Sequence, residues 1–144
     1  MRLIAVDFGT KRTGIALGES RTADPGSGLA LPFEMFENLT DAQLAQAIAD
    51  LARREAVDQI VVGLPLNADG SVSQQTKRTE QFISVLMGTT VTPIVRYSEY
   101  LSSHDAESKL AGHYTRMQKR QRVDALAAAR ILQDYIDGLP REGT

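Results

Sequence analysis

The sequence has no cysteine and no tryptophan, and its net charge at neutral pH is only -2. Without cysteine, neither a disulfide framework nor a thiolate zinc site can form. The small net charge argues against a protein coated in basic residues for indiscriminate nucleic-acid binding, so any basic surface has to be local. No apolar run approaches the roughly 18 residues of a membrane span, and no signal-peptide pattern opens the chain. These absences favour a cytoplasmic protein without a membrane partner.

A chain of 144 residues with 42% hydrophobic composition has room for one well-buried domain. We expect this domain to span residues 1–138 and a polar tail to follow at 139–144.

The first eighteen residues, MRLIAVDFGTKRTGIALG, predict two strands joined by a tight turn. Residues 3–6 are apolar at every position, which is typical of a strand covered on both faces of a sheet. Asp7 follows at the edge of the core, where an anion is costly unless something compensates its charge. A bound metal ion is one compensation, and the alternative is a turn that the aspartate caps through its own backbone. This stretch leaves both interpretations open.

The rest of the chain predicts a mixed α/β arrangement. A third strand at 29–36 contains Pro32 and should therefore lie at a sheet edge, and a capping box at Thr40 starts a helix. We then expect a strand at 58–63, a helix at 73–87, a strand at 91–95, a short helix from Ser102 to near Gly112, and a last helix from about 122 to 137. Residues 112–122 have few core residues, and we expect them to be mobile.

This order predicts a five-stranded mixed sheet flanked by helices, with strands 1–3 antiparallel and strands 1, 4 and 5 parallel. Ligands gather at the carboxyl ends of parallel strands in such sheets. Asp7, Asn67 and Glu99 follow the three parallel strands, so we expect them to converge on one rim.

Asp124 is the second informative carboxylate. Helical spacing places it on the same stripe as Ala128, Ile131 and Tyr135, where the pattern calls for an apolar residue. One interpretation is structural: Asp124 lies near the start of the predicted helix, where the helix dipole stabilises a negative charge. However, Asp7, Glu99 and Asp124 are all expected at one rim, and three clustered carboxylates repel one another unless a hard cation lies between them. Mg²⁺ or Mn²⁺ suits such oxygen ligands.

The same segments resemble the YqgF/RuvX family of small RNase H-like proteins, which are described as Holliday-junction resolvases and as nucleases that mature a ribosomal-RNA precursor. The matching segments are AVDFGTKRTGIALG at 5–18, VVGLPLNADG at 61–70, the Thr76/Arg78/Phe82 spacing, SEYLSS at 98–103 and RVDALAAARIL at 122–132. The resemblance implies an RNase H-like fold with Asp7, Glu99 and Asp124 as the catalytic, metal-binding carboxylates.

Two positions depart from the family pattern. This chain has Ser98-Glu99-Tyr100 where the family often has Asp-Glu-Arg, and Ser103 where threonine is common. The carboxylate is retained, but a positive charge near the site is lost. We expect Arg96, two residues before Ser98, to replace that charge.

The function that follows is metal-dependent endonucleolytic cleavage of structured nucleic acid. Phosphodiester hydrolysis needs a nucleophilic water and a stabilised leaving oxygen, and two divalent ions about 3.5 to 4 Å apart supply both. A four-way DNA junction is the first candidate substrate, and it requires two symmetric cuts and hence a homodimer; precursor 16S ribosomal RNA is the alternative. A non-catalytic nucleic-acid or ribosome-associated binding factor is a further alternative. An actin-like ATPase begins with a similar hairpin, but it needs a second domain.

Candidate nucleic-acid contacts are basic or polar residues expected near this rim. They are Lys11, Arg12, Asn67, Lys77, Arg78, Arg96, Arg116, Lys119, Arg120 and Arg122. Such residues would bind phosphates without reading sequence. The alternative for each basic residue is a solvated surface charge, and the alternative for Asn67, which we favour, is a role in the turn at 67–70. The run from 116 to 122 is the densest group, because four basic residues fall within seven positions next to Asp124.

Overall fold

The structure, a computed structural model, describes the backbone of residues 1–20, 28–100 and 116–139, and their side chains except those of 116–124. The elements are β1 (Arg2–Asp7), β2 (Arg12–Ser20), β3 (Gly28–Glu37), α1 (Asp41–Arg54), β4 (Gln59–Leu66), α2 (Gln74–Met87), β5 (Ile94–Tyr100) and α4 (Arg116–Asp137). The strands form one sheet in the order β3-β2-β1-β4-β5. The pairs β1–β2 and β2–β3 are antiparallel, and β1–β4 and β4–β5 are parallel. The predicted mixed sheet is confirmed.

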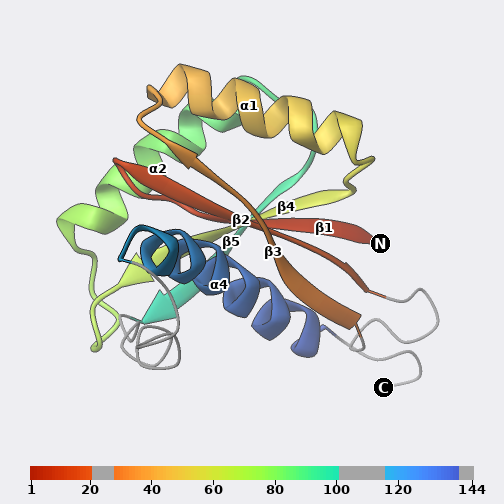
Figure 1. Cartoon of the computed structure of the whole chain (residues 1–144). Coiled ribbons are helices and arrows are strands. Elements are labelled where there is room, and N and C mark those ends of the chain that lie inside the picture. The colour runs from red at the N-terminus through yellow and green to blue at the C-terminus, as the bar shows by residue number, and fades with distance from the viewer. Residues whose placement is uncertain (21–27, 101–115, 140–144) are drawn as a thin grey trace.

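The sheet lies between two helical layers, with α1 and α2 on one face and α4 on the other (Figure 1). Side chains of the central strand β1 alternate between the two cores. Ile4 and Val6 belong to the core with α1 and α2, whereas Leu3 and Ala5 belong to the core with α4. All four side chains are fully buried, which confirms the prediction that this strand is covered on both faces.

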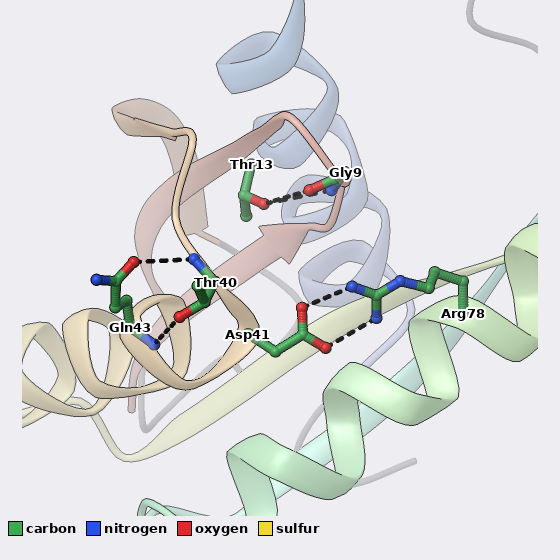
Figure 2. Close-up of polar contacts among 6 residues, drawn as sticks. All are labelled: Gly9, Thr13, Thr40, Asp41, Gln43 and Arg78. Carbon is green, nitrogen blue, oxygen red and sulfur yellow. Dashed lines mark hydrogen bonds and ion pairs between the residues drawn. The ribbon is translucent and has the colours of Figure 1, made fainter.

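Polar caps fix where α1 begins. The Thr40 hydroxyl accepts a hydrogen bond from the Gln43 N–H, and the Gln43 side chain accepts one from the Thr40 N–H (Figure 2). This is the predicted capping box. Ser73 caps α2 in the same way with Thr76. No helix in the described part of the chain is long and apolar enough to cross a membrane.

β3 is an edge strand, as predicted from Pro32. The register between β2 and β3 shifts beside Ile15, where Phe33 has no partner. Leu29 and Leu31 are 65% and 56% exposed. The edge of the sheet beyond β2 therefore presents apolar side chains to solvent.

Three elements depart from their predicted bounds. β4 continues to Leu66 and not only to Gly63, and β5 continues to Tyr100 and not only to Val95, so Glu99 lies within the strand that it was expected to follow. β5 begins at Ile94 rather than Val91, because the Pro93 carbonyl accepts the Ile60 N–H and starts the ladder with β4, while Val91 is fully exposed. α4 begins at Arg116 rather than near 122, since arginine, lysine and glutamine are strong helix formers even without apolar neighbours. The expected helix at 102–112 and the first part of the expected mobile segment, residues 112–115, lie outside the described residues.

Candidate active site

Asp7 is the last residue of β1 and belongs to the face of the sheet that α4 covers. Leu3 and Ala5 are buried between the sheet and α4, and residues two apart along a strand share a face. Asp7 itself is half-buried. Its carboxylate therefore lies at the edge of the core, as predicted.

Phe8 anchors this strand end from the opposite face. Its ring stacks on that of Phe82 in α2, with centroids 4.6 Å apart and planes inclined by 10°. The guanidinium of Arg78 lies 5.1 Å from the centre of the Phe8 ring, and it donates hydrogen bonds of 2.8 and 2.6 Å to the two carboxylate oxygens of Asp41 (Figure 2). This packing holds the end of β1, and it gives Arg78, a predicted phosphate contact, a partner within the protein.

The turn after β1 is closed by Gly9 and Thr13. The Gly9 N–H donates to Thr13 Oγ1 at 3.3 Å, and the same hydroxyl donates to the Gly9 carbonyl at 3.2 Å (Figure 2). A Cβ at position 9 would lie 2.2 Å from the Arg12 carbonyl oxygen, so the turn requires glycine. The turn places exposed Lys11 and half-buried Arg12 beside the strand end that carries Asp7.

Glu99 lies near the end of β5, in register with Pro65 of β4. Tyr97, two residues earlier, packs against the core with α4 and meets Tyr135 of that helix edge-on at 6.2 Å. Glu99 shares the face of Tyr97. The two predicted ligands Asp7 and Glu99 therefore stand on the same face of the sheet, on the two strands that flank β4.

Gly63 of β4 lies between these strands. The parallel register pairs Val6 with Val62, so Asp7 is beside Gly63. A Cβ at Gly63 would lie 3.5 Å from Glu99 Oε2, which means that the Glu99 carboxylate reaches back over β4. Strands on either side of a common neighbour are about 9.5 Å apart. The position above Gly63 is occupied by Ile131 of α4, whose Cδ1 would lie 2.6 Å from a Cβ there, and Glu99 Oε2 lies beside it.

Glu99 is held by Arg130 of α4, a residue that the sequence analysis did not select. Arg130 Nη2 donates to Glu99 Oε1 at 3.2 Å, and the two side chains are 37% and 24% exposed. Burial raises the pKa of Glu99 above its usual value; Arg130 opposes this effect, and the charge of Asp134 adds to it. The sequence did contain a signal for this residue. The run Ala127-Ala128-Ala129 indicates a helix that packs closely on the sheet, and the long charged side chain of Arg130 directly after it would be expected to extend to a polar partner at the edge of that contact.

α4 runs antiparallel to β4 across this face. The Tyr135 hydroxyl donates to Gln59 at the start of β4 at 2.8 Å, whereas Ile131 lies over Gly63 farther along that strand. Going back along α4 therefore leads toward the carboxyl ends of the parallel strands. The backbone of Asp124 is in α4 about two turns before Ile131, and its side chain is outside the described part.

Arg96 does not occupy the position expected from the sequence. It lies three residues from Glu99 and therefore on the opposite face of β5. Its guanidinium pairs with both carboxylate oxygens of Glu80 in α2, at 2.7 and 3.1 Å. The positive group that contacts Glu99 is Arg130 instead.

Asn67 takes part in the turn that follows β4. Its amide Nδ2 donates to Ser71 Oγ at 2.9 Å, and its backbone N–H donates to the Ser71 carbonyl at 3.0 Å. Gly70 closes the turn with a φ of 85°, a conformation that favours glycine. This is the structural role favoured for Asn67 from the sequence.

The remaining basic residues lie on α2 and α4. Lys77 is exposed in the first turn of α2. Arg116, Lys119, Arg120 and Arg122 lie in the first two turns of α4, and their side chains are not described.

The described side chains contain no group of three acidic, histidine or cysteine residues arranged to hold a metal ion, and Asp124 is not among them. Asp7 and Glu99 supply carboxylate oxygens, which suit Mg²⁺ or Mn²⁺ and not a soft metal. The donor set of these two acids therefore fits a small hard cation.

Comparison with known proteins is consistent with this arrangement. The family model for RuvX, described as Holliday junction resolvase, matches residues 1–138. A candidate pre-16S rRNA nuclease of Rhodopirellula baltica is 36% identical over 99% of this chain and 80% of its own length. A protein of the same name from Burkholderia mallei is 37% identical over 96% of this chain and 89% of its own length.

Two solved structures share the fold at low sequence identity. Thermus thermophilus RuvC superposes with a TM-score of 0.54 and 13% identity, covering 91% of this chain and 92% of RuvC. The fowlpox virus resolvase, solved with Holliday-junction DNA, gives a TM-score of 0.54 and 12% identity, covering 94% and 99% of the two chains. With residues 1–138 matched by the family model, the chain belongs to the RuvX family of nucleases and has the RNase H-like fold.

Proposed function

We propose that this protein is a divalent-metal-dependent endonuclease that hydrolyses phosphodiester bonds in a four-way DNA junction. The observation that carries the proposal is the placement of Asp7 and Glu99 on one face of the sheet, on either side of Gly63. α4, which carries Asp124, leads toward the same rim. With Asp124 on that helix, three separated segments would bring acids to the carboxyl ends of the parallel strands, where ligands bind in open α/β sheets.

Asp7, Glu99 and Asp124 would hold Mg²⁺ or Mn²⁺, with a two-ion site as the working arrangement. Divalent ions bound there supply a nucleophilic water near neutral pH and stabilise the charge on the leaving oxygen. The protein's part is to fix the acids. Phe8 clamps the end of β1 against α2, and the buried Thr76 hydroxyl donates to the Pro65 carbonyl, which fixes β4 opposite Glu99.

Basic groups on three elements would bind the substrate backbone. Lys11 and Arg12 follow Asp7 in the turn, Lys77 is exposed on α2, and the run from 116 to 122 precedes Asp124 on α4. Phosphate contacts of this kind position the duplex without reading sequence. Two symmetric cuts in a junction need two such sites, so the proposal includes a homodimer.

A second candidate substrate is the precursor of 16S ribosomal RNA, which the names of the relatives with 36% and 37% identity favour. The same acids and ions would cleave RNA, and a single site would suffice.

The test is purified protein with Mn²⁺ on three substrates: a four-way DNA junction, a linear duplex of the same sequence and a structured precursor RNA. Paired cuts in the junction, absent with EDTA, are expected. Asp50→Asn, which changes a half-buried acid of α1 on the other helical layer, is the matched control for Asp7→Asn. If only the RNA is cleaved, the substrate is precursor RNA and not the DNA junction. If cleavage survives both EDTA and Asp7→Asn, the proposed site is wrong.

A further inference from the structure

Glu99 has two carboxylate oxygens in different surroundings. Oε1 accepts a hydrogen bond from Arg130 Nη2 at 3.2 Å, whereas Oε2 lies above Gly63. A carboxylate on a free side chain can exchange its two oxygens by rotating about its last torsion. Here the contact with α4 assigns one oxygen to the arginine and leaves the other directed over β4, toward the strand of Asp7.

The contact is made by elements that are themselves well fixed. Ile131, the residue after Arg130, is fully buried and fills the space over Gly63. Tyr135, one turn later, is bound to Gln59 at 2.8 Å and packs on Tyr97. The backbone from which Arg130 extends therefore has little freedom relative to β4 and β5.

The location of Arg130 also separates it from the other arginines near β5. Arg96 is bound to Glu80 on the opposite face, and Arg78 is bound to Asp41 under Phe8. Arg130 contacts a predicted metal ligand itself, and its side chain is only about one-third exposed, at 37%. Hydrogen-bonding partners of ligating carboxylates orient those ligands and tune the metal site.

We infer that Arg130 is a positioning residue of the metal site: it holds Glu99 Oε1 so that Oε2 faces the cation. The inference rests on the proposed function, because it assumes that Glu99 binds the ion. Arg130 acts through Glu99, without contacting substrate phosphate. Its loss leaves Glu99 in place but free to rotate, so the carboxylate has to be ordered each time an ion binds.

The test measures Mn²⁺ binding to the protein alone by titration calorimetry, for wild type, Arg130→Met and Arg130→Lys. Arg130→Met should weaken Mn²⁺ binding by about 10-fold or more, as is typical of outer partners of metal ligands. Arg130→Lys keeps the charge without the planar guanidinium, and its Mn²⁺ affinity should lie between those of wild type and Arg130→Met. Arg53→Met is the matched control, because Arg53 forms a comparable ion pair with Asp50 on α1 at 2.9 Å; it should bind Mn²⁺ like wild type.

Two further measurements separate the alternatives. Thermal unfolding in EDTA measures the contribution of Arg130 to stability. If Arg130→Met is less stable but binds Mn²⁺ like wild type, Arg130 has a structural role only and the inference is wrong. The salt dependence of junction binding in EDTA reports phosphate contacts: it should not change in Arg130→Met, and a slope reduced by about 1 would make Arg130 a phosphate contact instead. Unchanged or tighter Mn²⁺ binding in Arg130→Met would overturn the inference alone. Failure of wild type to bind Mn²⁺ would overturn the proposed metal dependence with it.

Discussion

Gly63 lies directly beneath Ile131, so close that a Cβ on the glycine would be 2.6 Å from Ile131 Cδ1. This contact sets how near α4 comes to β4 and thus how near it comes to Glu99. Gly63→Ala should lower the free energy of unfolding by about 1 to 3 kcal/mol, the usual cost of overpacking a core. Urea denaturation of the metal-free protein measures it.

The control is Gly88→Ala at the end of α2, where the nearest atom would be 3.6 Å away and φ is -81°. It should change stability by less than about 1 kcal/mol. Ile131→Val removes Cδ1 and should cost about 0.5 to 1.5 kcal/mol alone, yet restore stability in the Gly63→Ala background. Additive losses in the double variant would show that the two positions do not collide.

Removal of any one of the three acids should abolish metal-dependent cleavage while the protein stays folded. The variants are Asp7→Asn, Glu99→Gln and Asp124→Asn, each nearly isosteric with the native residue. Without metal they should be neutral or slightly stabilising, because one of several mutually repelling anions is removed. Circular dichroism and cleavage assays on the same samples separate the two effects. A variant that unfolds, while its folded fraction keeps full specific activity, would assign that acid a structural role.

Glu99 should make stability depend on pH in the metal-free protein. Burial raises its pKa, so folding favours the protonated acid. The stability that this provides is complete below the pKa of the unfolded acid, about 4.3, and is lost as pH rises through the higher folded value. Glu99→Gln should therefore be more stable than wild type at neutral pH in EDTA, with the difference vanishing below about pH 4.

Asp69 offers a contrast of opposite sign. Hydrogen bonds from the Ser71 hydroxyl and N–H lower its pKa. Asp69→Asn should therefore lose stability at neutral pH and approach wild type as the solution is acidified. If Glu99→Gln also lost stability at neutral pH and recovered it in acid, the pKa of Glu99 would be lowered by its partners and not raised by burial.

The basic run on α4 should control the salt dependence of nucleic-acid binding. Neutralising each duplex phosphate contributes about 0.9 to the slope of log affinity against log salt. Lys119→Ala with Arg120→Ala should weaken binding and flatten the slope by up to about 2, for any base sequence. Arg53→Ala with Arg54→Ala on α1 changes the net charge equally and should leave the slope unaltered. If the α4 pair also leaves it unaltered, the substrate path lies along Lys11, Arg12 and Lys77.

The arrangement of the sheet could be predicted from the sequence because buried strands and helices have apolar residues at characteristic spacings. The unbroken apolar run at 3–6 identified the central strand, Pro32 identified the edge, and connections through helices required parallel pairing. The predicted stripe on the last helix was also sound, since Ala128 and Ile131 are fully buried. The positions of Asp7 and Glu99 on one rim followed from that topology.

Features that depend on contacts between distant segments were not accessible. The pairing of Arg130 with Glu99 joins residues 31 positions apart and leaves no periodic mark. The expectation for Arg96 failed because it used distance along the chain, whereas the side of a strand is set by odd or even spacing. The start of β5 depends on a backbone hydrogen bond to the Pro93 carbonyl, which no side-chain pattern reports.

The packing of α4 across the sheet, chiefly on β1, β2 and β3, affects how the protein matures during synthesis. Asp7 ends the first described strand, whereas the helix that carries Asp124 and Arg130 is the last described element. Domains fold as units, and contacts between distant segments close late because of their loop entropy. Asp7 and Glu99 of the proposed site are therefore synthesised before the helix that packs over them. The proposed site is therefore incomplete until α4 has been synthesised and has packed on the sheet.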